Sequence, residues 1–253
     1  MFSLFFPDEC RICKTALTEL TRVPVCARCL SAPEPLTPEY FCITCRTPFQ
    51  NRFPLDAAGR CRLCRTGARG FESAYCFGAY EGALRELIHL FKYRRMKPLA
   101  RALSACLVSA LPRDQKFDVV VPMPLYWRRK WRRGFNQSEL LARRIAQSCG
   151  IPLRNAVRRI RSTQTQAGLS NAERRENVAG AFRVRSPRVI QGRRVLLIDD
   201  VMTTGATASA CGLALRRGGA KSVTLLALAR VDRRLFEPAG EKLRAFSRTT
   251  EVA

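Results

Sequence analysis

The sequence of 253 residues has very little histidine and lysine: one histidine, His89, and 7 lysines. A single histidine excludes zinc sites that use several histidines, HExxH metalloprotease sites and multi-histidine catalytic groups. His89 falls within a helical pattern of apolar residues. We therefore expect it to be a packed or rim residue rather than a catalytic one.

Long apolar runs and two common nucleotide-binding signatures are also missing. No run of about 20 uncharged apolar residues occurs, which excludes a bilayer-spanning helix. The apolar stretch over 1–7 lacks a basic leader and is too short for a signal peptide, so we expect a cytoplasmic protein with reduced thiols. Neither a Walker A sequence nor a GxGxxG turn is present, which argues against P-loop ATP hydrolysis and against hydride transfer.

Acidic residues are scarce relative to basic ones. The chain has 45 Lys and Arg against 20 Asp and Glu, a formal charge of +25, and 38 of the basic residues are arginine. A polyanionic partner is expected, because the planar guanidinium group matches phosphate oxygens better than an ammonium group does. For any single arginine, a solvated basic surface is the alternative.

The length predicts two folding units and a tail. A cysteine-rich module is expected over 1–69, an α/β domain over 70–232 and a flexible basic tail over 233–253. Four cysteines outside the module stand alone in apolar or small-residue contexts, and we expect them to be buried packing residues: Cys76, Cys106, Cys149 and Cys211.

The other eight cysteines form four CxxC pairs, which in a reducing compartment are typical of zinc ligands. Two structural zinc sites are predicted, and zinc would replace the apolar core that this segment lacks. Gaps of 12 and 15 residues favour pairing the motifs in sequence order, with an interleaved pairing as the alternative. The predicted metal ligands are Cys10, Cys13, Cys26, Cys29, Cys42, Cys45, Cys61 and Cys64.

From about residue 70, helical and strand patterns alternate. Helices are expected over 81–93, 99–111, 136–148 and 206–217, and strands over 117–121, 194–198 and 222–229. The last strand, helix and strand form a βαβ unit, which predicts a parallel sheet flanked by helices. Ligands of such sheets bind at the carboxyl ends of the strands.

The sequence VLLIDDVMTTGAT lies at such a strand end. Backbone N–H groups and hydroxyls at the start of a helix can bind a phosphate, and the residues in that position are Thr203, Thr204, Gly205, Ala206 and Thr207. Asp199 and Asp200 can accept hydrogen bonds from a ribose diol or hold a divalent cation through water. The alternative is a capped helix that follows two incidental acids.

This motif resembles the phosphoribosyl pyrophosphate (PRPP) motif of type I phosphoribosyltransferases. The whole chain resembles the ComF family of bacterial competence proteins, which join a zinc-ribbon module to such a domain. The resemblance also covers VPMPLYWRRKWRRGFNQSELLARRIA, STQTQAGLSNAERRENVAGAF and the segment around LRELIHLFKYRR. It implies an α/β fold of type I phosphoribosyltransferase kind with a small amino-terminal zinc-ribbon module.

The resemblance also implies roles for residues. Asp199 and Asp200 would be catalytic and contact the ribose diol, residues 203–207 would bind the 5-phosphate, and the loop at Pro122 and Met123 would bind pyrophosphate, with magnesium accompanying PRPP. Residues 162–177 would form the mobile hood over the site. Arg132, Arg133, Arg174 and Arg175 are donors that could neutralise a leaving pyrophosphate.

Family members are linked to DNA uptake in natural transformation, which implies single-stranded DNA and a helicase-like competence ATPase as partners, with peripheral association with the uptake machinery. The resemblance does not decide whether the protein turns over PRPP. The chain is either an accessory protein that binds PRPP and handles DNA, or an active enzyme that transfers ribose 5-phosphate to an unknown nitrogen acceptor.

Residues 128–175 hold thirteen Arg or Lys, and aromatic residues interleave with the first of them. Basic and aromatic side chains together are typical of single-strand binding. The predicted nucleic-acid contacts are Arg128, Arg129, Trp131, Arg132 and Arg133. In the alternative, Trp131 and Phe135 pack inward and the arginines serve PRPP alone.

Overall fold

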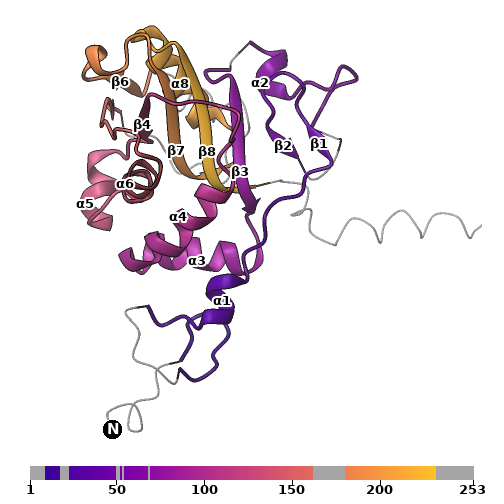
Figure 1. The fold of residues 1–253 in the computed structure, drawn as a ribbon, viewed down its shortest axis with the longest axis vertical. Helices are drawn as coiled ribbons and strands as arrows, with labels where there is room; N and C mark the ends of the chain where they lie inside the picture. Colours follow the sequence, from indigo (N-terminus) through magenta and orange to yellow (C-terminus); the bar gives the residue numbers. More distant parts are fainter. Residues whose placement is uncertain are drawn as a thin grey trace, which may run out of the picture.

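The computed structural model describes residues 9–17, 23–49, 52, 54–67, 69–161 and 180–231. Its centre is a four-stranded sheet in the order β3-β8-β7-β4, with every pair parallel (Figure 1). The strands are β3 (Ser73–Ala79), β4 (Val119–Pro122), β7 (Arg194–Met202) and β8 (Ser222–Arg230). The predicted parallel α/β sheet is confirmed.

The strands are apolar along most of their length because the sheet is covered on both faces. Ile198 of β7 and Leu226 of β8 are opposite each other and fully buried. At the amino end of β7, the guanidinium of Arg194 donates to the Asp118 carboxylate at 2.7 Å. This contact holds the pKa of Asp118 well below its usual range and ties β7 to the residue that precedes β4.

Helices lie on both sides of the sheet (Figure 1). One buried cluster joins the sheet to α3 (Gly82–Tyr93), α4 (Ala100–Ser109) and α6 (Gln137–Cys149), and the other joins it to α8 (Ala206–Arg217). All four were predicted within two residues of these bounds. The 3-10 helices are η2 (Lys97–Leu99) and η3 (Pro187–Val189). No helix among the described residues is long and apolar enough to cross a membrane.

Strand β7 is longer than its sequence pattern indicates. The prediction ended it at Ile198, but the ladder with β8 continues to the pair Met202 and Arg230. The turn therefore begins at Thr203, and both Asp199 and Asp200 lie within the strand. The long β8 partner extends the strand past the two polar residues.

Several elements were not predicted. They are the edge strand β3, the helix α5 (Trp127–Arg133) and the antiparallel hairpin of β5 (Val157–Arg159) and β6 (Phe182–Val184). The isolated cysteines are also less uniform than expected. Cys211 is fully buried, whereas Cys76, Cys106 and Cys149 are only partly buried. His89 is exposed on α3.

The described part of residues 1–69 forms two small modules on different parts of the molecule (Figure 1). The first contains α1 (Ala27–Ser31) and shares a buried cluster with α3. The second contains β1 (Tyr40–Phe41), β2 (Pro48–Phe49) and α2 (Arg62–Arg65), and it shares a cluster with β7 and α8.

The two edges of the central sheet are contacted by chain outside the named strands. On the β3 side, the segment between the modules passes the strand, and Leu36 N–H donates to the Phe77 carbonyl. On the β4 side, Val120 N–H donates to the Pro152 carbonyl and Arg154 N–H donates to the Val120 carbonyl, both at 2.9 Å.

Candidate functional site

A pocket of about 460 Å³ opens at the carboxyl ends of β4 and β7. The last turn of α3, one face of α5, the start of α6 and the turn before α8 complete its wall. This is the place where parallel α/β sheets bind ligands. It also lies at the predicted motif.

The two adjacent acids differ in their partners. The carboxylate of Asp199 accepts hydrogen bonds from the Ser138 hydroxyl at 3.1 Å and from the Asp200 backbone N–H at 2.9 Å. Asp200 pairs instead with the Lys92 ammonium at 3.0 Å, and both side chains are only 13% exposed. Burial and the neighbouring Asp200 charge raise the pKa of Asp199 to about 7. Asp199 therefore titrates near neutral pH.

The turn after β7 bends sharply at Gly205, which has a φ of 78° and precedes the first residue of α8. This φ favours glycine, and a Cβ atom there would also lie 2.8 Å from the Leu63 side chain and 2.9 Å from the Met202 side chain, which would have to shift. Thr203, Gly205 and Thr207 border the pocket. The Thr204 hydroxyl accepts from the Ala206 backbone N–H at 3.4 Å and so belongs to the turn itself.

The loop after β4 forms the opposite wall. Met123 is anchored at both ends of its backbone: its N–H donates to the Ile198 carbonyl at 2.8 Å, and its carbonyl accepts from the Asn136 amide at 3.0 Å. Met123 borders this pocket, whereas Pro122 borders a second hollow beside it. Pro122 and Met123 are neighbours in this loop, but Met123 lines the pocket and Pro122 lines the second hollow.

Gln137 is a site residue that the sequence reasoning missed. Its side chain is 2% exposed and borders the pocket, and its carbonyl accepts from Arg133 at 3.2 Å. Within the described part of the chain its amide nitrogen has no hydrogen-bond partner. A buried donor needs an acceptor, and the position of this nitrogen at the pocket makes it available to a ligand oxygen.

Four cationic side chains border the same pocket, and only two acids do so among the described residues. The cations are Lys92, Arg129, Arg133 and Arg159. Burial lowers the pKa of the Arg129 guanidinium, as do the nearby Arg133 and Arg132. The cations outnumber the acids in this lining, so the pocket suits an anionic ligand.

Helix α5 divides the predicted nucleic-acid residues between two faces. Arg129 and Arg133 border the pocket, and Arg133 also lies over the Tyr93 ring at 5.2 Å. Arg128, Trp131 and Arg132 are exposed, Trp131 by 85%. Phe135 is buried and contacts the Phe91 ring at 5.5 Å. The inward packing considered for both aromatics is therefore right for Phe135 and wrong for Trp131.

The predicted hood over 162–177 lies outside the described residues, as do Arg174 and Arg175 and the tail over 233–253. Lys92, Asn136, Gln137, Ser138 and Arg159 were not predicted as site residues. The available signal was FNQSE within the quoted stretch, where Asn136 caps α6 by accepting from Ser138 N–H at 3.2 Å. In this stretch Asn136, Gln137 and Ser138 directly follow Phe135, the aromatic residue that packs inward.

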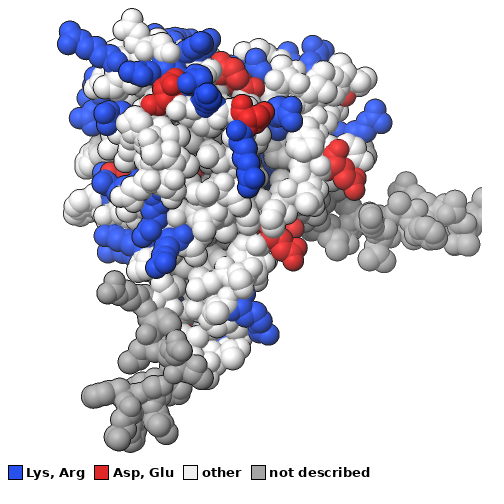
Figure 2. Space-filling view, viewed as in Figure 1, with Lys and Arg blue, Asp and Glu red and all other residues white. Residues whose placement is uncertain are grey.

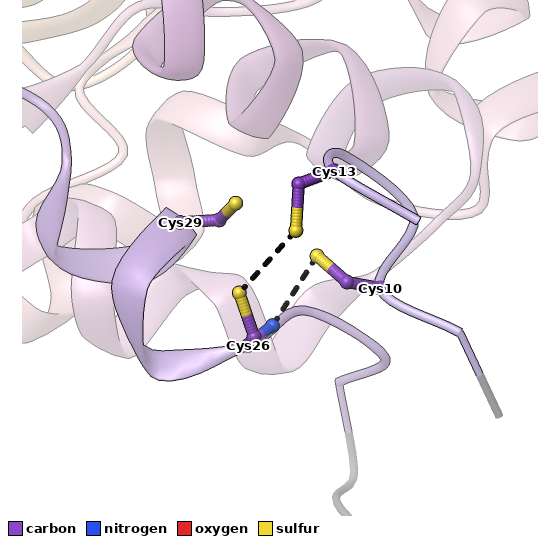
Figure 3. Close-up of side chains that lie close together, drawn as sticks. All are labelled: Cys10, Cys13, Cys26 and Cys29. Atoms are coloured by element: carbon purple, nitrogen blue, oxygen red, sulfur yellow. Dashed lines mark hydrogen bonds between the residues drawn. The ribbon is translucent and has the colours of Figure 1, made fainter. Parts of the chain in front are cut away.

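The eight paired cysteines converge in two groups, Cys10 with Cys13, Cys26 and Cys29, and Cys42 with Cys45, Cys61 and Cys64. Figure 3 shows the four sulfur atoms of the first group pointing toward one centre. The Sγ–Sγ distances are 3.7 Å for Cys13 and Cys26 and 3.7 Å for Cys45 and Cys61. Pairing in sequence order is confirmed, and the interleaved alternative is wrong.

These distances suit zinc. A tetrahedral ion with Zn–S bonds of about 2.3 Å holds its sulfur atoms about 3.8 Å apart, whereas a disulfide holds them at about 2.0 Å. Backbone N–H groups donate to two of the thiols, from Cys26 to Cys10 at 3.4 Å and from Cys61 to Cys42 at 3.2 Å. Both groups could hold a structural zinc ion with four sulfur ligands.

Residues 89–252 match the family model of the phosphoribosyl transferase domain. The chain is also 36% identical to Competence protein F of Haemophilus influenzae, over 68% of this chain and 79% of that protein. It belongs to the ComF family of phosphoribosyl transferase domain proteins. Other relatives of this ComF-family chain are the DNA utilization protein YhgH of Escherichia coli K12, 32% identical over 90% of this chain and 99% of that protein, and Competence protein ComFC of Bacillus subtilis, 28% identical over 90% and 87%.

Proposed function

We propose that the pocket binds PRPP with magnesium and that the protein helps to handle incoming single-stranded DNA in natural transformation. The observation that carries the first half is the combination, in one pocket, of two strand-end carboxylates, a glycine turn at a helix start and four cations. The names of the relatives, which refer to competence and DNA utilization, support the second half.

The charges of the pocket suggest how PRPP would lie. The ribose diol would face Asp199 and Asp200, and the 5-phosphate would accept hydrogen bonds at the turn of Thr203 and Gly205. The pyrophosphate would lie toward Met123 and the guanidinium groups of Arg129 and Arg133. Gln137 Nε2 would then find an acceptor among the ligand oxygens.

The oxygen donors of Asp199 and Asp200 fit magnesium, which prefers a few carboxylates together with water and substrate phosphates. Lys92 already neutralises Asp200, so Asp199 is the carboxylate that a magnesium shell would recruit. When bound, the metal would balance the charge of the pyrophosphate. The chain's own part is to orient the diol and to hold the leaving pyrophosphate.

The alternative function is an active phosphoribosyltransferase. In that reaction the bond between ribose C1 and the pyrophosphate oxygen breaks, a bond from C1 to an acceptor nitrogen forms, and pyrophosphate leaves with the electron pair. The proton that the nitrogen loses passes to the pyrophosphate or to water. Arg129 and Arg133 would stabilise the charge that develops on the leaving group. Release of pyrophosphate on addition of a nitrogen acceptor distinguishes this enzyme from a protein that only binds PRPP.

For DNA, the exposed face of α5 with Arg128, Trp131 and Arg132 supplies phosphate donors and an aromatic surface. A helicase-like competence ATPase is the proposed protein partner. The proposed setting is the cytoplasm, with peripheral association with the uptake machinery. Pull-down of the ATPase on the immobilised zinc-loaded protein tests that partner.

Calorimetric titration of the zinc-loaded protein with PRPP and magnesium tests the first half. Asp200→Asn should weaken binding about 10- to 100-fold, the size expected for hydrogen bonds to a charged group. Asp114→Asn is the matched control, because Asp114 is an exposed carboxylate away from the pocket. Equal affinities for the two variants would contradict the proposed placement of PRPP.

A further inference from the structure

We propose that a second hollow, between α5 and the β5–β6 hairpin, is the groove in which a single DNA strand lies. This inference rests on the proposed DNA-handling function and gives it a site. The hollow has a volume of about 630 Å³. We call it the hairpin groove. It is bordered by Trp127 and Lys130 on α5 and by Arg158, Arg183 and Arg185 on the hairpin.

The hairpin side of the groove is an arginine surface. Arg158 and Arg183 are directly opposite each other across the antiparallel pair, and Arg185 follows directly after β6, two residues beyond Arg183. All three are exposed, while Val157 and Phe182 on the other side of the hairpin are buried. The alternation therefore directs apolar side chains to the core and three guanidinium groups outward.

Like charges directly opposite each other destabilise an antiparallel pair. The lining offers no free acid to offset this, because Glu139 is the one acidic residue that borders the groove in the described part of the chain. Glu139 already pairs with Lys130 at 3.3 Å and with Arg143 at 3.6 Å. The groove thus carries a surplus of positive charge that an external anion would relieve.

The opposite wall adds an aromatic surface. Trp127 of α5 borders the groove and is 61% exposed. On the hairpin side, Ile160, which follows β5, is also exposed. Large apolar side chains among cations suit a ligand that alternates flat bases with phosphates better than inorganic phosphate or an acidic peptide. A single nucleic-acid strand has this alternation, and its unpaired bases are free to stack on tryptophan.

The groove is continuous with the PRPP pocket. Pro124, Leu125, Asn136 and Arg159 border both hollows. In Figure 2, basic side chains gather along the edge of the molecule that holds β6 and α5. A strand in the groove would therefore pass beside the pocket, so that DNA and PRPP would meet at Arg159.

Fluorescence anisotropy of a 15-nucleotide oligo(dT) with the full-length zinc-loaded protein tests the groove. The double variant Arg158→Ala and Arg183→Ala should bind at least tenfold more weakly at 0.1 M salt. The slope of log K against log salt should also fall by about 1.4, because each lost contact to a single strand removes about 0.7. Arg101→Ala with Arg217→Ala removes the same charge from exposed positions outside both hollows and should bind like the unmodified protein.

Trp127→Ala tests stacking. This variant should weaken binding of oligo(dT) severalfold but leave binding of an abasic strand of the same length unchanged, because an abasic strand offers phosphates without bases. An equal loss for both strands would overturn the stacking role. PRPP affinity and zinc content of each variant show whether it is folded.

The outcomes separate the groove from the broader proposal. If the unmodified protein binds oligo(dT) and the Arg158 and Arg183 variant binds as tightly as its control, the groove is wrong and the DNA-handling function stands on other residues. If the unmodified protein does not bind oligo(dT) at all, the DNA-handling function fails and the groove fails with it.

Discussion

The two four-cysteine modules have the same ligand chemistry but contact different parts of the protein. The first, with Cys10, Cys13, Cys26 and Cys29, packs on α3. The second, with Cys42, Cys45, Cys61 and Cys64, packs on the strands and the turn that form the pocket. Identical spacing motifs thus serve two purposes: one module extends the fold, and the other supports the site.

Two sets of contacts join the second module to the site, and a third contact joins it to β3. Leu63 of α2 lies so close to Gly205 that a Cβ atom there would be 2.8 Å away. The buried Arg230 guanidinium donates to the carbonyls of Pro48 and Met202, both at 3.3 Å, and so links β2 to the end of β7. Ala74 N–H of β3 donates to the Cys45 carbonyl at 3.0 Å.

The described part of the first module is linked to the pocket through α3. Val25 and Cys29 are buried in one cluster with Leu87 and Phe91, and Lys92 on the same helix pairs with Asp200. None of its described residues borders the pocket. Loss of this module should therefore affect the site less than loss of the second.

Loss of zinc should give the largest difference between the modules. Cys45→Ser with Cys61→Ser should remove one zinc ion and abolish measurable PRPP binding, because zinc supplies the folding free energy of so small a module. Cys10→Ser with Cys13→Ser should also remove one zinc ion but change the Kd for PRPP by about threefold or less, which is under 1 kcal/mol. Zinc assay and calorimetry measure both. If both double variants lost PRPP binding equally, the proposed difference between the two modules would be wrong.

Gly205→Ala should have the next largest effect. The substitution adds a Cβ at a φ of 78° and against the end of the Leu63 side chain, so it should both strain the turn and shift that side chain. Gly150→Ala is the matched control, since Gly150 has a φ of 65° but open space around it. The control should cost about 1 to 2 kcal/mol of stability and leave PRPP affinity intact. Gly205→Ala should cost more and weaken PRPP binding at least tenfold.

Leu63→Ala probes the same contact from the module side. Removing this buried side chain should lower the free energy of unfolding by about 2 to 4 kcal/mol and loosen the turn at Gly205. Val25→Ala is the comparison in the first module, where Val25 is equally buried. It should lower stability without changing the Kd for PRPP. Thermal unfolding and calorimetry test the pair, and a normal Kd for Leu63→Ala would show that the contact does not support the site.

The pH dependence should show the smallest effect. Because the pKa of Asp199 is raised to about 7, its carboxyl is mostly protonated at pH 6, and affinity for magnesium and PRPP should fall about tenfold from its plateau above pH 8. Asp199→Asn should flatten this profile, and the Cys10 and Cys13 variant should keep it. A raised carboxyl pKa also contributes stability below pH 4 that is lost as pH rises through 7, so the ligand-free protein should be less stable at pH 8 than at pH 5.

Much of this architecture follows from local sequence. The βαβ unit, the eight thiol ligands and the turn at Gly205 are visible because hydrophobic period, CxxC spacing and glycine each act over a few residues. Helix α5 was missed because WRRKWRR has no buried residue and hence no apolar stripe to detect. Strand β3 was missed because SAYCFGA contains small residues and a glycine, which weaken the apolar pattern of a strand.

The remaining site residues depend on contacts between distant parts of the chain. Ser138 meets Asp199 across 61 residues, and Lys92 meets Asp200 from another helix. Neither contact leaves a local pattern. The different roles of the two modules depend likewise on Leu63 and Arg230 contacting the end of β7. The CxxC spacing identifies the metal ligands, whereas the tertiary contacts of each module determine which part of the fold its metal would stabilise.

The chain that contacts both edges of the sheet also limits self-association. An open edge strand is a template on which other copies can pair, and this leads to strand exchange and aggregation. Here the residue that pairs with β3 lies in a segment with Pro33, Pro35 and Pro38, which have no backbone N–H to offer a further strand. Residues 152–154 occupy the β4 edge. The described chain beside both edges therefore occupies positions where a further strand would pair, which disfavours growth of the sheet between molecules.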